Sequence, residues 1–149
     1  MEKIMTPKMT EKTAKTRLTS AGLDPTAHRT RVLLAVGNTA QPLSAVEILE
    51  KIRSTANINR VTVYRILDLL VEHEVLNRLD LGKHAQRFCL RGVERTEDHA
   101  HFHCTRCDRY LCIDAPLPPL AQDVLARMGL EVERVDIRLE GVCPACKKK

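Results

Sequence analysis

Two Cys-x-x-Cys pairs, separated by 35 residues, constrain the fold of this chain more than any other feature of its sequence. The pairs are Cys104 with Cys107 and Cys143 with Cys146. Each pair can present two thiolates to one tetrahedral ion, and zinc suits such a set because it is redox-inert and accepts four sulfur ligands. Four thiolates leave no open coordination position. We therefore predict a structural zinc site that ties the two ends of the intervening segment together.

The alternative interpretation of these pairs is a redox dithiol. Such a pair is expected at the N-terminus of a helix within a β-α-β unit, whereas the two pairs here bracket the elements between them. Residues 1–25 contain no apolar signal segment, and no stretch approaches the roughly 20 apolar residues of a membrane span. We expect a soluble, cytoplasmic protein with no membrane partner, whose six cysteines serve metal or thiol chemistry rather than disulfides.

The N-terminal half of the chain is basic and has helical periodicity. Residues 1–67 hold 11 Lys and Arg against 5 Asp and Glu, whereas residues 68–149 hold 13 against 14. This balance suits a polyanionic partner such as nucleic acid, although a solvated surface would have the same composition. Helices are predicted over 11–21, over 28–36, from a capping box at Ser44 and Glu47 onward, and over 60–73.

The periodicity changes after Glu74. Two short strands, 75–81 and 85–90, flank residues 82–84 and predict a β-hairpin. Helices followed by a hairpin are typical of a winged helix-turn-helix, whose recognition helix is the one immediately before the wing. In that helix, over 60–73, apolar residues recur at helical spacing. The predicted core stripe consists of Val63, Ile66, Leu67 and Leu70.

The C-terminal part of the chain is predicted to form a second, smaller unit. Strands over 109–114 and 134–140 flank an amphipathic helix over 117–128. A unit of roughly 50 residues is small for an independent core, so we expect it to be stabilised by a metal and by dimerisation. The predicted fold class is α+β: a winged helix-turn-helix DNA-binding domain (1–90), a polar hinge (91–98), and a small α/β dimerisation and metal-binding domain (99–149).

A second group of potential metal ligands lies around the predicted hinge. His99, His101 and His103 alternate, so on a strand all three would point to one face. Cys89 ends the wing and Cys112 follows the first cysteine pair. Thiolate with imidazole favours zinc, although Fe(II), Co and Ni also accept imidazole. An ion bound to such a set would fix one domain against the other and bias the hinge.

Other interpretations of this second group are surface histidines with a buried structural cysteine, or a zinc-stabilised thiol enzyme that uses Cys89 or Cys112. The sequence contains none of the HExxH, GxSxG, Walker or GxGxxG patterns. The zinc deaminases need a Glu between the ligand His and their Pro-Cys-x-x-Cys segment, whereas the residues between these histidines are Ala100 and Phe102. We therefore expect no enzyme.

Three segments together resemble the ferric uptake regulator family. They are Val61-Thr62-Val63-Tyr64-Arg65-Ile66-Leu67, His99-x-His101-x-x-Cys104-x-x-Cys107 and Gly141-Val142-Cys143-x-x-Cys146. The likeness spans residues 11–146 in the family's order. It implies a homodimeric, metal-dependent repressor that binds palindromic, double-stranded operator DNA, controls metal-uptake genes and has no small-molecule substrate. It places Thr62, Tyr64 and Arg65 on the recognition helix, with Arg60 just before it; Arg can read guanine, and Tyr can contact thymine or phosphate.

The resemblance also indicates which metal is sensed. Cys89 stands at the wing-end position where the zinc uptake regulator branch has Cys and where iron and peroxide sensors tend to carry Glu or Asp. A thiolate softens the site toward zinc. The regulatory ligands implied are Cys89, His99, His101 and Cys112. Asp80 and His84 are the alternatives to Cys112, and an iron- or peroxide-responsive regulator of the same family is the alternative function.

Overall fold

The computed structural model describes residues 8–80, 86–92, 100–113, 122–131 and 135–148 of the chain. The chain divides into two compact units, Met1–Arg91 and Gly92–Lys149, and each has a three-stranded sheet. Most of the predicted hinge lies outside the described residues. No helix within the described ranges is both long and apolar enough to cross a membrane.

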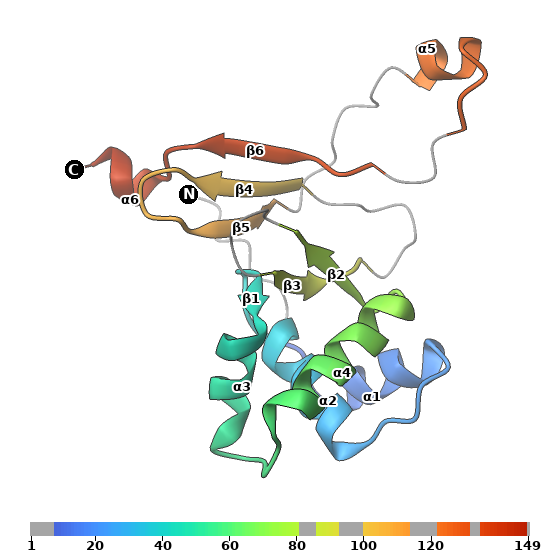
Figure 1. The fold of residues 1–149 in the computed structure, drawn as a ribbon, viewed down its shortest axis with the longest axis vertical. Helices are drawn as coiled ribbons and strands as arrows, with labels where there is room; N and C mark the ends of the chain where they lie inside the picture. Colours follow the sequence, from blue (N-terminus) through green and yellow to red (C-terminus); the bar gives the residue numbers. More distant parts are fainter. Residues whose placement is uncertain (1–7, 81–85, 93–99, 114–121, 132–134, 149) are drawn as a thin grey trace. The chain divides into compact units, whose positions relative to one another are not determined.

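The first unit is a winged helix-turn-helix, as predicted (Figure 1). Its elements are α1 (Glu11–Ser20), α2 (Ala27–Gly37), β1 (Leu43–Ser44), α3 (Ala45–Arg53), α4 (Arg60–Glu72), β2 (Leu76–Leu79) and β3 (Arg87–Leu90). The sheet order is β1-β3-β2, and both pairings are antiparallel. Because β2 and β3 pair directly, they form the two strands of the wing.

Side-chain caps determine where the helices of the first unit begin. Thr10, Thr26 and Asn59 each accept a hydrogen bond from the backbone N–H three residues ahead, at the starts of α1, α2 and α4. These bonds satisfy donors that have no partner within the helix. The predicted capping box of α3 is present in full: Ser44 Oγ accepts from Glu47 N at 3.2 Å, and Glu47 Oε2 accepts from Ser44 N at 2.7 Å.

The apolar stripe of α4 is buried in the core of the first unit, as its spacing predicts. Val63, Leu67 and Leu70 are fully buried, and Ile66 is nearly so. The same core includes residues from each of the other three helices, among them Leu18, Leu33 and Ile48. Burying a side chain of this size contributes roughly 1.5–3 kcal/mol. The stripe therefore anchors α4 and leaves the opposite face of its first turns exposed to solvent.

The second unit contains β4 (Ala100–Cys104), β5 (Tyr110–Ile113), α5 (Gln122–Arg127), β6 (Arg138–Gly141) and α6 (Pro144–Lys147). Its sheet order is β5-β4-β6, with β4 antiparallel to β5 and parallel to β6. The strands predicted over 109–114 and 134–140 are thus not neighbours, because β4 lies between them. Part of the predicted helix, residues 117–121, lies outside the described residues, as does residue 134.

Candidate metal centres and nucleic-acid interface

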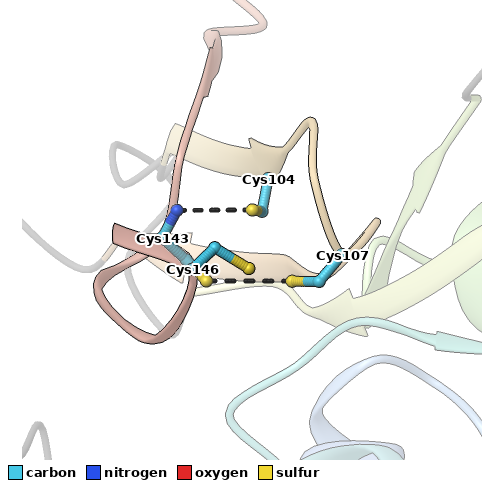
Figure 2. A group of neighbouring side chains, drawn as sticks. All are labelled: Cys104, Cys107, Cys143 and Cys146. Atoms are coloured by element: carbon cyan, nitrogen blue, oxygen red, sulfur yellow. Dashed lines mark hydrogen bonds between the residues drawn. The ribbon is translucent and has the colours of Figure 1, made fainter. Parts of the chain in front are cut away.

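The four cysteines of the two Cys-x-x-Cys pairs come together in the second unit (Figure 2). Cys104 ends β4, and Cys143 immediately precedes α6. All four sulfur atoms lie within 4.8 Å of one another, and Cys107 Sγ lies 3.7 Å from Cys143 Sγ. A tetrahedral ion with zinc–sulfur bonds of about 2.3 Å places its sulfurs about 3.8 Å apart. The cluster therefore has the donor type, the number of donors and the spacing of a structural zinc site.

Two of these thiols have strongly shifted pKa values. The backbone N–H of Cys143 donates to Cys104 Sγ at 3.3 Å. This bond, with weaker contributions from the N–H groups of Cys107 and Arg106, lowers the pKa of Cys104 to about 6, against the effect of burial. Hydrogen bonds to the sulfurs of Cys107 and Cys143 raise the pKa of Cys146 to about 12. The metal-free cluster thus contains a ready thiolate beside a thiol whose proton an incoming ion has to displace.

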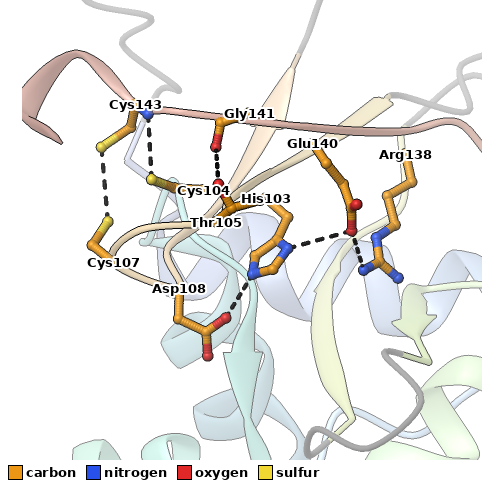
Figure 3. A network of polar contacts seen from close by, with 9 residues as sticks. All are labelled: His103, Cys104, Thr105, Cys107, Asp108, Arg138, Glu140, Gly141 and Cys143. Carbon is orange, nitrogen blue, oxygen red and sulfur yellow. Dashed lines mark hydrogen bonds and ion pairs between the residues drawn. The ribbon is translucent and has the colours of Figure 1, made fainter. Parts of the chain in front are cut away.

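A polar network borders the cluster (Figure 3). Nε2 of His103 lies 2.6 Å from Oδ1 of Asp108, and Nδ1 lies 3.6 Å from Oε1 of Glu140. Hydrogen bonding to Arg138, and secondarily to His103, lowers the pKa of the Glu140 carboxyl. Sequence reasoning did not predict this network. Its only local signal is the position of Asp108 directly after the first cysteine pair.

The candidate regulatory ligands of the second unit, His101 and Cys112, face each other across β4 and β5. They are direct partners in the antiparallel register, and their ligand atoms lie within 4.8 Å of each other. His101 is buried, and Cys112 is partly exposed. An imidazole and a thiol at this separation can bind the same soft ion.

The structure describes only some of the other candidate regulatory ligands. Cys89 lies on β3 of the first unit, where it pairs with Asn77 of β2 and is buried. Asp80 follows β2 and is exposed. His99 and His84 lie outside the described residues. Within the described part of the second unit, the structure therefore brings together His101 and Cys112 from this set.

The N-terminal part of α4 carries the predicted DNA-binding residues. Arg60, Tyr64 and Arg65 are exposed on it. Nη2 of Arg60 donates to the Tyr64 hydroxyl at 3.3 Å, and its guanidinium lies 5.5 Å from the centroid of the Tyr64 ring. Thr62 has a structural contact in addition, since its hydroxyl donates to the capping oxygen of Asn59 at 2.9 Å. The helix thus presents positive charge beside an aromatic face, which suits phosphate and thymine contacts.

Comparisons with known proteins agree on one family. The model of the ferric uptake regulator family matches residues 20–140. The ferric uptake regulation protein of Bacillus subtilis (strain 168) is 27% identical over 121 residues, which cover 80% of each chain.

Solved structures show the same fold. The Helicobacter pylori ferric uptake regulator matches with a TM-score of 0.72 at 21% identity, covering 97% of this chain and 99% of that one. A zinc uptake regulator solved in complex with zinc and DNA matches with a TM-score of 0.70 at 22% identity, covering 93% of each chain.

Proposed function

This chain belongs to the ferric uptake regulator family, and we propose that it is a zinc-responsive transcriptional repressor that binds palindromic operator DNA as a homodimer. The observation that carries the choice of zinc is the pairing of His101 with Cys112 across β4 and β5. One imidazole and one thiolate form a softer donor set than imidazoles with carboxylates, and softer sets favour zinc over Fe(II) and Mn(II).

The regulatory site we propose adds Cys89 and His99 to this pair. Zinc would supply a divalent charge at this site. Its binding would require the two thiols to be deprotonated and the two imidazoles to be neutral. The four cysteines of the second unit would hold a separate, structural zinc. The proposed DNA-binding domain is 1–90, the proposed dimerisation and metal-binding domain is 99–149, and the proposed hinge is 91–98. Because the regulatory ligands come from both sides of this hinge, a bound metal would set the orientation of the DNA-binding domain.

Homodimerisation is supported by apolar side chains that the second unit leaves exposed. Exposed apolar side chains of this unit include Val124, Met128, Leu130, Val135 and Leu139. The most exposed of these five is Met128, at 66%. Exposed apolar side chains on a small unit gain free energy when another protein buries them. A symmetric dimer would place two recognition helices about one turn of DNA apart, roughly 34 Å, which matches a palindromic operator.

Binding to DNA is proposed for the exposed face of α4. Arg60 and Arg65 would neutralise phosphates or read guanine, Tyr64 would contact thymine, and Thr62 would order the start of the helix. Because phosphate contacts release counterions, affinity for the operator is expected to fall steeply as salt increases. Repression follows when the dimer occludes a promoter.

The test is operator binding under buffered free-metal concentrations. Fluorescence anisotropy of a labelled duplex from the region upstream of the chain's own gene would be recorded while free Zn(II), Fe(II) or Mn(II) is varied. We expect zinc to activate binding at the lowest free concentration, and Cys112→Ser to shift that concentration upward. Leu111→Met is the matched control, because neighbouring strand residues point to opposite faces. Activation by Fe(II) with no response to zinc would overturn the choice of metal.

An iron-responsive regulator is the second candidate, favoured by the similarity to the ferric uptake regulation protein of Bacillus subtilis. The same titration separates the two candidates. A peroxide sensor would in addition show Fe-dependent oxidation of His101, seen by mass spectrometry as a gain of about one oxygen. Enzymatic turnover that requires the thiol of Cys89 or Cys112, without sequence-specific DNA binding, would contradict both candidates.

A further inference from the structure

The turn after the first cysteine pair has a backbone conformation that side chains disfavour. Asp108, which directly follows Cys107, has a φ of 59°, in the left-handed region. Glycine adopts this region freely, whereas a Cβ atom meets the neighbouring carbonyl oxygen there. Aspartate tolerates the region better than most residues, because its short side chain can form a local hydrogen bond. A side-chain contact is therefore expected to stabilise Asp108 in this conformation.

His103 supplies that contact (Figure 3). Its Nε2 lies 2.6 Å from Oδ1 of Asp108, a short distance typical of a hydrogen bond to a carboxylate. His103 immediately precedes Cys104 on β4, so this bond joins the residue before the turn to the residue after it. Backbone bonds close the same turn: Asp108 N donates to Cys104 O and Cys104 N donates to Arg109 O, each at 2.9 Å.

The second ring nitrogen of His103 faces β6. Nδ1 lies 3.6 Å from Oε1 of Glu140, which also accepts a hydrogen bond from Arg138 at 2.6 Å. The ring stacks on Tyr110, with centroids 4.4 Å apart and planes 9° apart, and His103 is buried. Because β6 leads directly to Cys143, one imidazole contacts both of the segments that carry the cysteine pairs.

The side chains of His103, Asp108 and Glu140 do not form a metal site of their own. The two carboxylates contact different nitrogens of the ring, on different sides of it, so they do not converge on one point where an ion could lie. Their arrangement is a chain that runs from the first cysteine turn through β4 to β6. This row of three side chains can therefore position the segments next to it, but it cannot hold an ion itself.

We propose that His103 and Asp108 are positioning residues for the four-cysteine site. The Asp108–His103–Glu140 chain holds the first cysteine turn in its left-handed conformation and keeps it in register with β6, so that the sulfurs are arranged for zinc before zinc binds. The proposal rests on the structural zinc proposed above. Preorganised ligands slow the loss of a metal, because release then requires the turn to open against the hydrogen bond of His103.

The test measures how Asp108→Gly changes the rate of zinc release. The direction of this change distinguishes two roles of residue 108. If the position contributed only backbone strain, Asp108→Gly would relieve it and slow zinc release. We expect the opposite, a release about tenfold faster, because a hydrogen bond to a charged group is lost. Release from the zinc-loaded full-length protein would be followed with a chromophoric zinc chelator. Asp24→Gly, which changes an exposed aspartate of the first unit, is the matched control.

Two further variants separate positioning from folding. Asp108→Asn keeps an acceptor oxygen and tolerates the left-handed region but loses the charge, so its zinc release should be slower than that of Asp108→Gly and faster than that of the wild type. His103→Phe keeps a ring to stack on Tyr110 but removes both nitrogens, so it should accelerate release to a similar extent. In the His103→Phe background, Asp108→Gly should accelerate release no further. Independent acceleration by the two changes, or slower release from Asp108→Gly alone, would refute the proposal.

A second measurement does not depend on zinc release. Amide hydrogen exchange of the metal-free, reduced protein should show faster exchange over residues 100–113 in Asp108→Gly than in Asp108→Asn. A variant that cannot retain zinc at all counts as the extreme of the expected result, provided that Asp108→Asn retains it. Absence of bound zinc from the wild type would instead refute the structural zinc site itself, so the two failures are distinguishable.

Discussion

Glu47 performs two structural tasks at once, and this makes the effect of its removal predictable. Its Oε2 accepts the Ser44 N–H at 2.7 Å in the capping box of α3 and lies 3.0 Å from Nη1 of Arg87 on β3. Arg87 also donates to Pro42 O at 3.0 Å, and Ser44 pairs with Arg87 in the sheet. One carboxylate therefore joins the start of α3 to the wing.

We predict that Glu47→Ala lowers the free energy of unfolding of the first unit by about 1–2 kcal/mol. Loss of its half of the capping box accounts for about 1 kcal/mol. The ion pair adds a few tenths, because Glu47 is 42% and Arg87 26% exposed and solvent screens their attraction. In a unit of this size, 1 kcal/mol changes the melting temperature by about 4–8 °C. The expected decrease in Tm is therefore about 4–16 °C.

The assay is thermal unfolding of the full chain, followed by the circular dichroism signal of its helices. Most helical residues in the described ranges belong to the first unit, so this signal reports mainly on that unit. Glu50→Ala, an exposed change on the same helix, should change stability by less than about 0.5 kcal/mol. A double-mutant cycle with Arg87→Met should give a coupling of about 0.5 kcal/mol that weakens in high salt. A Tm for Glu47→Ala within 2 °C of the wild type would refute the reasoning.

Three other predictions follow from the same structure. Leu67→Ala, which truncates a fully buried side chain, should destabilise the first unit by about 2–5 kcal/mol in urea unfolding, whereas a value below 1 would mean that the core collapses around the gap. Arg65→Ala should weaken operator binding and reduce the slope of log affinity against log salt by about 1, whereas Tyr64→Phe should weaken binding while leaving that slope unchanged. Zinc affinity of the four-cysteine site, measured by chelator competition, should fall more steeply below pH 6 than above it. The pKa of Cys104 is lowered to about 6, so only below that pH does its proton compete with zinc; a constant slope from pH 5 to 8 would contradict this.

Local patterns in the sequence predict the first unit well. The stripe of α4 and the capping box at Ser44 act over three or four residues, so their consequences can be read from neighbouring positions. The two-residue strand β1 was not predicted, because it forms through pairing with β3, more than 40 residues away. The contact of Arg87 with Glu47 also joins residues that are far apart in the sequence, so local patterns did not predict it either.

In the second unit, the spacing of residues in the sequence predicted the cysteine cluster but not the order of the strands. The cysteine pairs predicted the cluster, since two Cys-x-x-Cys pairs can present four thiolates to one tetrahedral ion. The central position of β4 was not predicted, because the alternation of its residues indicates a strand but not which strands pair with it on either side. Its parallel pairing with β6 joins segments more than 30 residues apart. The contact of His103 with Glu140 depends on that pairing.

The central position of β4 also connects the two candidate metal centres. Cys104 and His101 lie on this one strand, and the first cysteine turn closes the β4–β5 hairpin that places His101 opposite Cys112. A slip of one residue in this register would turn one of the two side chains to the other face of the sheet. Loss of the structural zinc would remove the constraint at the closed end of the hairpin and allow such slippage. It follows that regulatory metal affinity should be measured only on protein whose four-cysteine site is full, because a partly depleted sample would report the opening of the hairpin as weak sensing.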